Sequence, residues 1–273
     1  MSPRPPLTWL YVPGDRPDRV AKALASSADV VIVDLEDAVV ADAKPDARQA
    51  AAGALHGASR PLQVRVNAPG TAWHDDDVAM VARLPGAVGL RVPKAESVDA
   101  VRDVSTSAPD RDVHLLVESA LGLERAYDLA TATSDVASLG LGEADLRADL
   151  GVTSEDGLLW ARGRIVAAAA AAGLPPPAMA AYTDVRDLDG LAASCRRGRA
   201  LGFLGRTAIH PDQLDVIRAA FTPTEGEVER ARELLAAAEK GAATGQGAVA
   251  LADGRFVDAA VIRQAQRVVA LGD

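Results

Sequence analysis

Two apolar runs of the chain each end on carboxylates. Val113–Val117 stops at Glu118, and Val136–Gly142 runs into Glu143 and Asp145. Short aliphatic runs flanked by turn residues predict buried strands. Carboxylates at the C-terminal ends of successive parallel strands can meet in space. Two such groups suit Mg²⁺, with water and substrate as its other ligands. The pattern predicts metal-assisted chemistry on an oxygen-rich substrate, with Glu143 and Asp145 as rivals for the second ligand.

Strands and helices are predicted to alternate along the chain. The predicted strands are Trp9–Val12, Val30–Leu35, Leu62–Val66, Val88–Val92, Val113–Val117, Val136–Leu141, Ala178–Tyr182 and a last one within Phe203–Ile209. The predicted helices between them include Arg16–Ser27, Lys44–Leu55, Ser97–Ser105, Leu121–Ala130, Ser154–Ala172 and Leu188–Ala200. This order predicts an α/β fold, a (β/α)₈ TIM barrel, because βαβ connections make the strands parallel. A doubly wound open sheet is the alternative, which is weakened because no GxGxxG follows the first strand.

The C-terminal part is predicted to be helical. Helices are expected at Pro211–Ala219 and Thr224–Lys240, followed by a flexible link, Gly241–Gly247. The tail then resumes as Ala248–Val257 and ends in a helix, Asp258–Ala270, with Asp258 as its N-cap. We expect a barrel over residues 1–222, and C-terminal helices and a lid over 223–273 as part of the same structural unit. Such a tail can pack on its own barrel, swap to a neighbour or close over a site.

Composition narrows the class of protein. A chain of 273 residues that is 49% hydrophobic suits one large α/β domain. A formal charge of −9 argues against a nucleic-acid-binding surface. The longest apolar stretch, Ile165–Leu174, is too short to span a bilayer, and no signal peptide is predicted. The single cysteine, Cys195, fits a reducing compartment, so a cytoplasmic protein without a membrane partner is expected.

Other predicted strands also end on groups that could do chemistry. In a barrel these ends form the rim that carries the active site. The groups are Asp15 and Arg16, then Asp34, Glu36 and Asp37, then Arg65 and Asn67, then Lys94, and finally His210. Loops at this rim are polar in any barrel. The mixture of several acids, two arginines and a lysine is the more specific signal.

Seven motifs, taken in order, resemble the citrate lyase β-subunit (CitE-like) branch of the HpcH/HpaI aldolase family of CoA ester lyases. They are Pro13–Arg16, Asp34–Val39, Arg65–Asn67, Pro93–Glu96, Glu118–Ala120, Gly142–Leu146 and Ile209–Gln213. The resemblance runs from residue 9 to about 270. It implies a TIM barrel, usually trimeric, that binds Mg²⁺ and makes or breaks a carbon–carbon bond between an acyl thioester and an oxo acid. Malyl-CoA, citramalyl-CoA and citryl thioesters are the substrate types.

The resemblance implies roles for the two strand-end acids. The family's metal ligands fall on Glu118 and Asp145, because the motif places the second ligand directly before Leu146. The cation would bind oxygens of the oxo-acid portion beside Glu118 and polarise the carbonyl as a Lewis acid. The alternative roles are a helix N-cap for Asp145 and a solvated loop acid for Glu118.

Three basic residues are candidates for substrate contacts. Arg65 matches the family's substrate arginine and could hold a carboxylate or stabilise a thioester enolate, which makes it a catalytic candidate. Its alternative role is a structural salt bridge to Asp34 or Glu36. Arg16 resembles a second contact for an anionic group, and Lys94 could reach a thioester or a carboxylate. A Schiff base on Lys94 is disfavoured, since a metal-dependent site does not need one.

The acids after the second predicted strand are expected in the outer shell of the metal site. Asp34, Glu36 and Asp37 crowd one strand end, so each raises the pKa of the others unless it is paired. The expected neutralisers are Arg65, Lys94 and the metal. Two further basic residues, Lys44 and Arg48, are assigned structural roles. For His210 a structural role is favoured over a general base.

Asp258 is the tail residue expected to matter most. Asp253–Asp258 resembles the lid of the CoA-lyase members, in which an aspartate from one subunit completes the neighbour's site as acid or base. Phe256 and Ala260 stand where the family commonly has Met and Pro. These departures bear on the conformation of the lid more than on its aspartate. The alternative role is a plain N-cap, and one aspartate can do both.

Four functions follow from these features. The first is a Mg²⁺-dependent lyase, similar to class EC 4.1.3, that splits a 3-hydroxyacyl-CoA into an oxo acid and an acyl-CoA, with a homotrimer as the expected assembly. The second is an aldolase of free oxo acids, disfavoured because Asp37 stands where that branch carries His. The third is hydrolysis of a thioester such as malyl-CoA at the same site. The fourth is a non-catalytic interaction subunit, which the rim charges disfavour.

Overall fold

The computed structural model describes residues 4–243, 249–250 and 256–272. The chain divides into two compact units, Pro6–Arg218 and a smaller one made of Met1–Pro5 and Ala219–Asp273.

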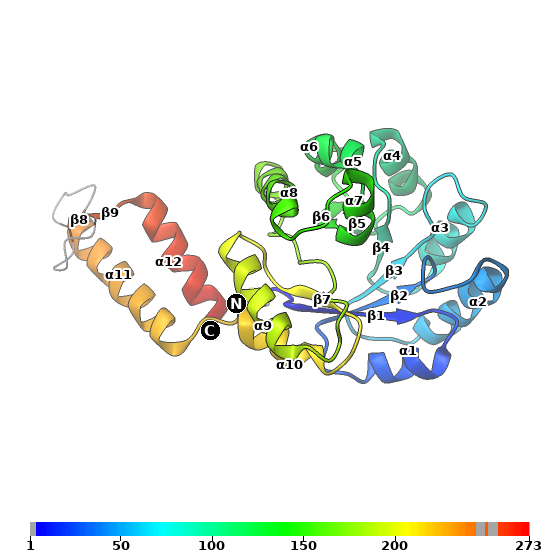
Figure 1. Ribbon diagram of the computed structural model, residues 1–273, viewed down its shortest axis with the longest axis horizontal. Coiled ribbons are helices and arrows are strands. Elements are labelled where there is room, and N and C mark those ends of the chain that lie inside the picture. Colours follow the sequence, from blue (N-terminus) through cyan, green and yellow to red (C-terminus); the bar gives the residue numbers. More distant parts are fainter. Residues whose placement is uncertain (1–3, 244–248, 251–255, 273) are drawn as a thin grey trace. The chain divides into compact units, whose positions relative to one another are not determined.

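The larger unit is built on a curled sheet of seven parallel strands (Figure 1). Its order is β6-β5-β4-β3-β2-β1-β7. The strands are β1 (Thr8–Pro13), β2 (Val30–Asp34), β3 (Leu62–Arg65), β4 (Val88–Val92), β5 (Val113–Val117), β6 (Val136–Leu141) and β7 (Arg206–Ala208). Every residue of β2 and β4 is buried, as expected for strands of a parallel sheet that are covered on both faces. The chain is therefore an α/β protein.

The predicted strand at Ala178–Tyr182 is not formed. This segment makes a single parallel bridge, between Met179 and Arg206, on the side of β7. Three prolines, Pro175–Pro177, precede it and remove backbone donors that a ladder would use. In the described part of the chain the sheet therefore has seven strands, and the eight strands of a closed barrel are not observed.

Helices connect the strands of the larger unit. They are α1 (Pro17–Leu24), α2 (Lys44–Leu55), α3 (His74–Arg83), α4 (Val98–Ser107), α5 (Ala120–Glu124), α6 (Ala126–Ala130), α7 (Glu143–Leu150), α8 (Leu159–Ala171), α9 (Leu188–Ala200) and α10 (Gln213–Phe221), with short 3₁₀ turns η1 (Ala41–Ala43) and η2 (Asp156–Leu158). α10 crosses the division between the units. The sequence did not predict α3 or α7. The helix predicted at Leu121–Ala130 is two helices joined at Arg125.

In the smaller unit two helices pack along each other (Figure 1). They are α11 (Glu225–Ala243) and α12 (Ala259–Gly272), with a short antiparallel pair, β8 (Val249–Ala250) and β9 (Phe256–Val257), between them in sequence. α11 runs three residues past its predicted end. Residues 244–248 and 251–255, which include most of the predicted link and part of the predicted lid, lie outside the described residues.

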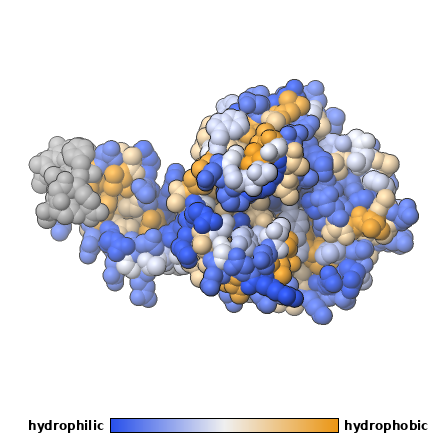
Figure 2. All heavy atoms as spheres, viewed as in Figure 1, coloured by the Kyte–Doolittle hydropathy of each residue, from blue (hydrophilic) through white to orange (hydrophobic). Residues whose placement is uncertain are grey.

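Hydrophilic side chains cover much of the visible face of the larger unit, with apolar ones in small groups (Figure 2). Among the described helices none combines the length and the apolar character that crossing a membrane requires.

Candidate active site

A cavity of about 710 Å³ lies in the larger unit and is lined by residues from the ends of several strands. Tyr11 of β1, Asp34 of β2, Arg65 of β3 and Arg91 of β4 line it, together with Glu118, the residue that follows β5. The carboxyl ends of parallel strands meet at one side of such a sheet, so residues distant in sequence converge there.

Glu118 is held in a fixed position. Its side chain is buried, and its Oε2 accepts a hydrogen bond of 3.0 Å from the backbone N–H of Lys94. Lys94 has φ = 49°, a left-handed conformation that is uncommon for a residue with a side chain. Burial, together with the nearby charge of Glu36, raises the pKa of Glu118 to about 7. The site therefore favours a cation beside this carboxylate.

Gly142 leaves the space that the Glu118 carboxylate occupies. A Cβ at Gly142 would lie 2.2 Å from Glu118 Oε1. The backbone N–H of Gly142 donates a 2.9 Å hydrogen bond to Val117 O, which ties the end of β6 to the end of β5. The glycine thus allows the strand that leads to Asp145 to pass directly against Glu118.

The structure distinguishes Asp145 from its rival Glu143. Glu143 accepts two hydrogen bonds from the buried Arg162, of 2.7 and 2.6 Å, and is occupied by that ion pair. Asp145 lies in the first turn of α7, lines the cavity, and makes no hydrogen bond or ion pair within the described residues. Glu118 and Asp145 therefore line one cavity with no cation of the protein paired to either side chain.

No third ligand joins this pair. Within the described residues no group of three or more His, Cys, Asp or Glu side chains is arranged to hold a metal ion. A cation bound by Glu118 and Asp145 would need water and substrate for its other ligands, as Mg²⁺ commonly does.

Arg65 is held by the acids that follow β2. It makes a bidentate contact with Asp34, of 2.8 and 2.6 Å, and its Nη1 lies 2.9 Å from Glu36 and 3.0 Å from Asp37. Burial opposes the charged form of Arg65, but the hydrogen bonds and charge of Asp34 raise its pKa. The alternative role, a structural salt bridge, is present. It also fixes the guanidinium in the cavity wall.

The remaining acid of this group, Glu36, is neutralised by two bases. Lys94 Nζ lies 3.0 Å from Glu36 Oε1, and Arg65 is its other partner. Burial raises the pKa of Glu36 in spite of these partners. Lys44 donates to the backbone oxygens of Leu35 and Glu36 at 3.0 and 2.8 Å, so it supports the loop after β2.

Three basic residues predicted at the strand ends do not line the cavity, and neither does Glu36. Arg16 is half exposed and pairs with Asp18 at 3.4 Å. Lys94 points its amine at Glu36 instead. His210 is exposed, and its Nδ1 accepts from the backbone N–H of Asp212 at 3.3 Å. Buried Gln213 holds that loop by accepting from Ile209 N and donating to Tyr182 O.

Asp258 lies in the smaller unit and is the N-cap of α12. Its Oδ1 accepts hydrogen bonds from Val261 N at 3.0 Å and from Ala260 N at 2.8 Å. These bonds lower the pKa of the Asp258 carboxyl. The predicted cap is confirmed. The catalytic role stays a prediction.

Sequence reasoning missed most of the arginines in the cavity wall. Those that line it besides Arg65 are Arg19, Arg91, Arg147, Arg162, Arg197 and Arg206. Arg206 is buried and donates to Ala180 O at 2.8 Å and to Ser194 Oγ at 2.9 Å. Arg91 lies within β4, and Arg206 is the first residue of β7, so neither is at the carboxyl end of its strand. For Arg91, an arginine inside an apolar strand was the available signal.

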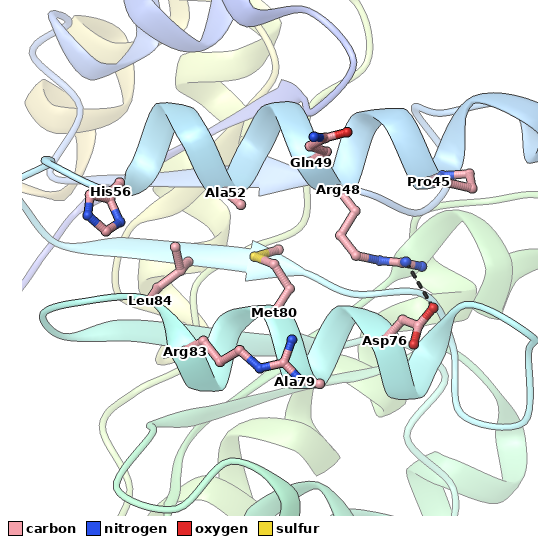
Figure 3. Close-up of a pocket in the computed structure, with 10 residues that line it drawn as sticks. All are labelled: Pro45, Arg48, Gln49, Ala52, His56, Asp76, Ala79, Met80, Arg83 and Leu84. Carbon is pink, nitrogen blue, oxygen red and sulfur yellow. Dashed lines mark hydrogen bonds and ion pairs between the residues drawn. The ribbon is translucent and has the colours of Figure 1, made fainter.

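A second cavity, of about 520 Å³, lies between α2 and α3 (Figure 3). Arg48 and Asp76 face each other across one end of it and pair at 3.0 Å, while Met80 and Leu84 supply apolar surface. Arg48 also pairs with Asp77 at 2.6 Å, which supports the structural role predicted for it. This groove lacks a pair of free acids and is not a candidate metal site.

Comparison with known proteins agrees with this geometry. The family model of the HpcH/HpaI aldolase/citrate lyase family matches residues 7–211. The chain belongs to this family. A CitE protein from Mycobacterium tuberculosis, solved with magnesium, acetoacetate and coenzyme A, is 35% identical with a TM-score of 0.85, over 100% of this chain and 99% of that one. The resemblance inferred from the seven motifs is confirmed.

Two relatives of this family differ in activity. A (3S)-malyl-CoA thioesterase from Cereibacter sphaeroides is 36% identical over 96% of this chain and 92% of its own length. An L-malyl-CoA/β-methylmalyl-CoA lyase from Rhodobacter capsulatus is 33% identical over 95% of this chain and 92% of its own length. A citrate lyase β subunit from M. tuberculosis, solved with oxaloacetate and magnesium, has a TM-score of 0.72 and 37% identity over 80% of this chain and 97% of that one.

Proposed function

We propose that this protein is a Mg²⁺-dependent carbon–carbon lyase that acts on a 3-hydroxyacyl-CoA such as malyl-CoA, citramalyl-CoA or a citryl thioester. The observation that carries the proposal is the pair of free acids, Glu118 and Asp145, in a cavity whose wall is rich in arginine. Oxygen donors of this kind suit Mg²⁺, and cationic walls suit an anionic oxo acid.

The residues present fit a magnesium ion. Glu118 is a buried carboxylate for which the protein supplies only a backbone N–H, and Gly142 keeps the space beside it open. Asp145 has no partner within the described residues. These two side chains would hold the ion. When bound, it supplies Lewis-acid polarisation of the oxo-acid oxygens.

Cleavage requires three changes in the substrate. The hydroxyl loses its proton, the bond from the hydroxyl carbon to the carbon beside the thioester breaks, and that electron pair becomes the thioester enolate, which takes a proton at carbon. Arg65, oriented by Asp34, presents a fixed positive charge to the anion that develops. Lys94 and Arg16 are proposed as further contacts for anionic groups of the substrate. To make these contacts, both side chains would have to leave their present partners.

Asp258 is proposed as the acid or base at the enolate carbon, supplied by the tail of a neighbouring subunit in a homotrimer. Its ionised carboxylate suits the condensing direction, in which a proton leaves the acetyl methyl group. A closed (β/α)₈ barrel and a cytoplasmic location are part of the same proposal, together with a tail that acts as a lid.

Hydrolysis of malyl-CoA is the second candidate, because a relative that is 36% identical over nearly the whole chain is a malyl-CoA thioesterase. The same residues would hold the substrate, and water would attack the thioester carbonyl in place of carbon–carbon cleavage.

One assay separates the two candidates. Malyl-CoA is incubated with the protein and Mg²⁺, and both the oxo acid and free thiol are measured over time. A lyase releases glyoxylate and leaves the thioester intact as acetyl-CoA. A thioesterase releases malate and free CoA thiol without glyoxylate. If malyl-, citramalyl- and citryl-CoA all stay intact, both candidates are wrong.

A further inference from the structure

Arg91 is a buried guanidinium without a counter-ion. It lies in β4, is 6% exposed, and lines the active-site cavity. Its one hydrogen bond is from Nη1 to Gln63 Oε1, at 3.2 Å, and its Nε is buried with no hydrogen-bond partner. It forms no ion pair within the described residues. Removing a charge from water without a partner costs several kcal/mol, so such a group favours an anion.

The other arginines with little exposure in this wall already have ion-pair or hydrogen-bond partners. Arg65 is surrounded by three carboxylates, and Arg162 pairs with Glu143 and Glu155. Arg206 pairs with no acid in the part of the chain that the structure describes, but it donates to a carbonyl and a hydroxyl and has the thiol of Cys195 at 3.6 Å. Arg91 is therefore the buried cation of this wall whose charge the protein leaves least compensated.

The surroundings of Arg91 hold it in place without neutralising it. The ring of Tyr11 lies 5.7 Å from its guanidinium carbon and 5.2 Å from that of Arg65. The imidazole of His114, on the neighbouring strand, is uncharged at neutral pH, because burial and the charge of Arg91 lower its pKa to about 3. Tyr11, His114 and Gln63 are uncharged neighbours, so none of these three side chains competes with an anion of the substrate for Arg91.

The position of the guanidinium relative to the metal pair follows from β6. A Cβ at Gly140 would lie 3.3 Å from Arg91 Nη2, and a Cβ at Gly142 would lie 2.2 Å from Glu118 Oε1. Gly140 lies in β6, and Gly142 follows two residues later, directly after the strand. The Arg91 guanidinium therefore lies beside Gly140 and the Glu118 carboxylate beside Gly142, and both side chains line the same cavity. One short-chain oxo acid with two carboxylates could reach both positions.

We infer that Arg91 binds a second carboxylate on the oxo-acid half of the substrate, so that the preferred substrate class is a thioester that releases a dicarboxylic 2-oxo acid. The inference rests on the proposed function, in which the first carboxylate lies at Glu118 and Asp145. A citryl thioester, which releases oxaloacetate, has the required second carboxylate. Malyl- and citramalyl-CoA, which release glyoxylate and pyruvate, lack it.

Binding of free oxo acids tests the assignment without catalysis. Oxaloacetate and pyruvate differ by that one carboxylate, and calorimetry with Mg²⁺ present measures the affinity of each. A charged hydrogen-bonded contact predicts about 10- to 100-fold tighter binding of oxaloacetate to the wild type. Arg91→Gln should reduce this ratio to about 1 and leave pyruvate binding unchanged, and Arg91→Lys should keep part of it.

Arg60→Gln is the matched control. Arg60 lies outside the cavity, donates to Ala23 O, Leu24 O and Ser26 O, and also has a buried, unpartnered Nε. Its replacement should lower the melting temperature and keep the oxaloacetate preference. If Arg91→Gln does not fold, the assignment is tested by the ratio of oxaloacetate affinity to pyruvate affinity in the wild type and in Arg91→Lys.

Two results overturn the assignment: a wild type that binds both acids equally, or an Arg91→Gln protein that weakens both equally. Thioester turnover separates this failure from that of the proposed function. If the protein cleaves citryl- and malyl-CoA equally well, the proposed function stands and the role of Arg91 is wrong. If the protein binds oxaloacetate preferentially through Arg91 but cleaves no thioester, the anion site stands and the proposed function is wrong.

Discussion

Replacement of Gly142 by alanine should disable the metal site while preserving the fold. The new Cβ would lie 2.2 Å from Glu118 Oε1 and 2.4 Å from its Cγ. Non-bonded heavy atoms pack at about 3.5–4.0 Å, so the carboxylate has to move by roughly 1 Å or more. Gly142 has φ = −91°, which alanine adopts without strain, so the contact with Glu118 is the main perturbation.

The size of the effect follows from the precision that a reacting site needs. A misplacement of about 1 Å can lower a rate about 100-fold. We expect Gly142→Ala to reduce turnover at fixed Mg²⁺ by about that factor and to raise the Mg²⁺ concentration needed for half-maximal rate. Overpacking should cost about 1–3 kcal/mol of unfolding free energy, which leaves the protein folded at 25 °C.

Gly53→Ala serves as the matched control, since no atom lies within 4 Å of the Cβ position and Gly53 is inside α2. It should raise the unfolding free energy by about 0.5–1 kcal/mol and leave the Mg²⁺ dependence unchanged. Rates are measured against Mg²⁺ concentration, and folding is checked by circular dichroism. A Gly142→Ala protein with the wild-type Mg²⁺ dependence would refute the placement of the metal beside Glu118.

Three further predictions concern single side chains. Glu118→Gln and Asp145→Asn should each lower Mg²⁺-dependent turnover at least about 100-fold with little change in melting temperature, and full activity in either would remove that residue from the metal site. Asp258→Asn should lower the rate by about 10²–10⁴-fold at unchanged stability, because asparagine caps a helix as well as aspartate, whereas an unchanged rate would leave Asp258 with the cap alone. His114→Asn should make the protein less sensitive to acid. The pKa of the His114 imidazole is about 3 in the folded protein, against an ordinary value of 6.5, so on acidification the unfolded chain binds the proton first. The free energy of unfolding of the wild type therefore falls as the pH drops below about 6.5. Denaturant unfolding at pH 5 and pH 7.5 should show a loss of about 2 kcal/mol in the wild type that the variant lacks, and equal losses in both proteins would contradict the lowered pKa.

The sequence predicted the strands that are continuous apolar runs and missed elements without that signal. β2 and β4 are buried along their whole length, so their composition alone identifies them. Ala178–Tyr182 is also largely apolar, but it holds three alanines and no β-branched residue, and the prolines before it remove backbone donors; it makes one bridge. α3 begins with three aspartates, Asp75–Asp77, which look like a loop in sequence and are favourable in the first turn of a helix.

Site residues at strand ends were predictable because parallel strands bring those ends together. Glu118 and Asp145 are the clearest case. The partners of each charge were not predictable, because pairing depends on tertiary packing. The family motif favoured Asp145 over Glu143, but the physical difference between them, the pairing of Glu143 with Arg162 of α8, became visible only in the structure. Arg91 was missed because the role proposed for it depends on the absence of a paired carboxylate, and a sequence does not show which charged side chains are left unpaired.

The balance of charge in the cavity wall explains why the two candidate activities share one site. A paired charge such as Arg162 with Glu143 fixes the shape of the wall and contributes little net field. The metal pair and Arg91 lie outside such pairs. In the proposed arrangement, a cation at Glu118 and Asp145 together with Arg91 would bind the oxo-acid half equally well before cleavage and before hydrolysis. The outcome then depends on whether water reaches the thioester carbonyl, since excluding water from the site prevents hydrolysis there. Residues that cover the thioester, and not those that bind the oxo acid, should therefore decide between lyase and thioesterase, and substitutions at Glu118 or Asp145 should reduce both activities by the same factor.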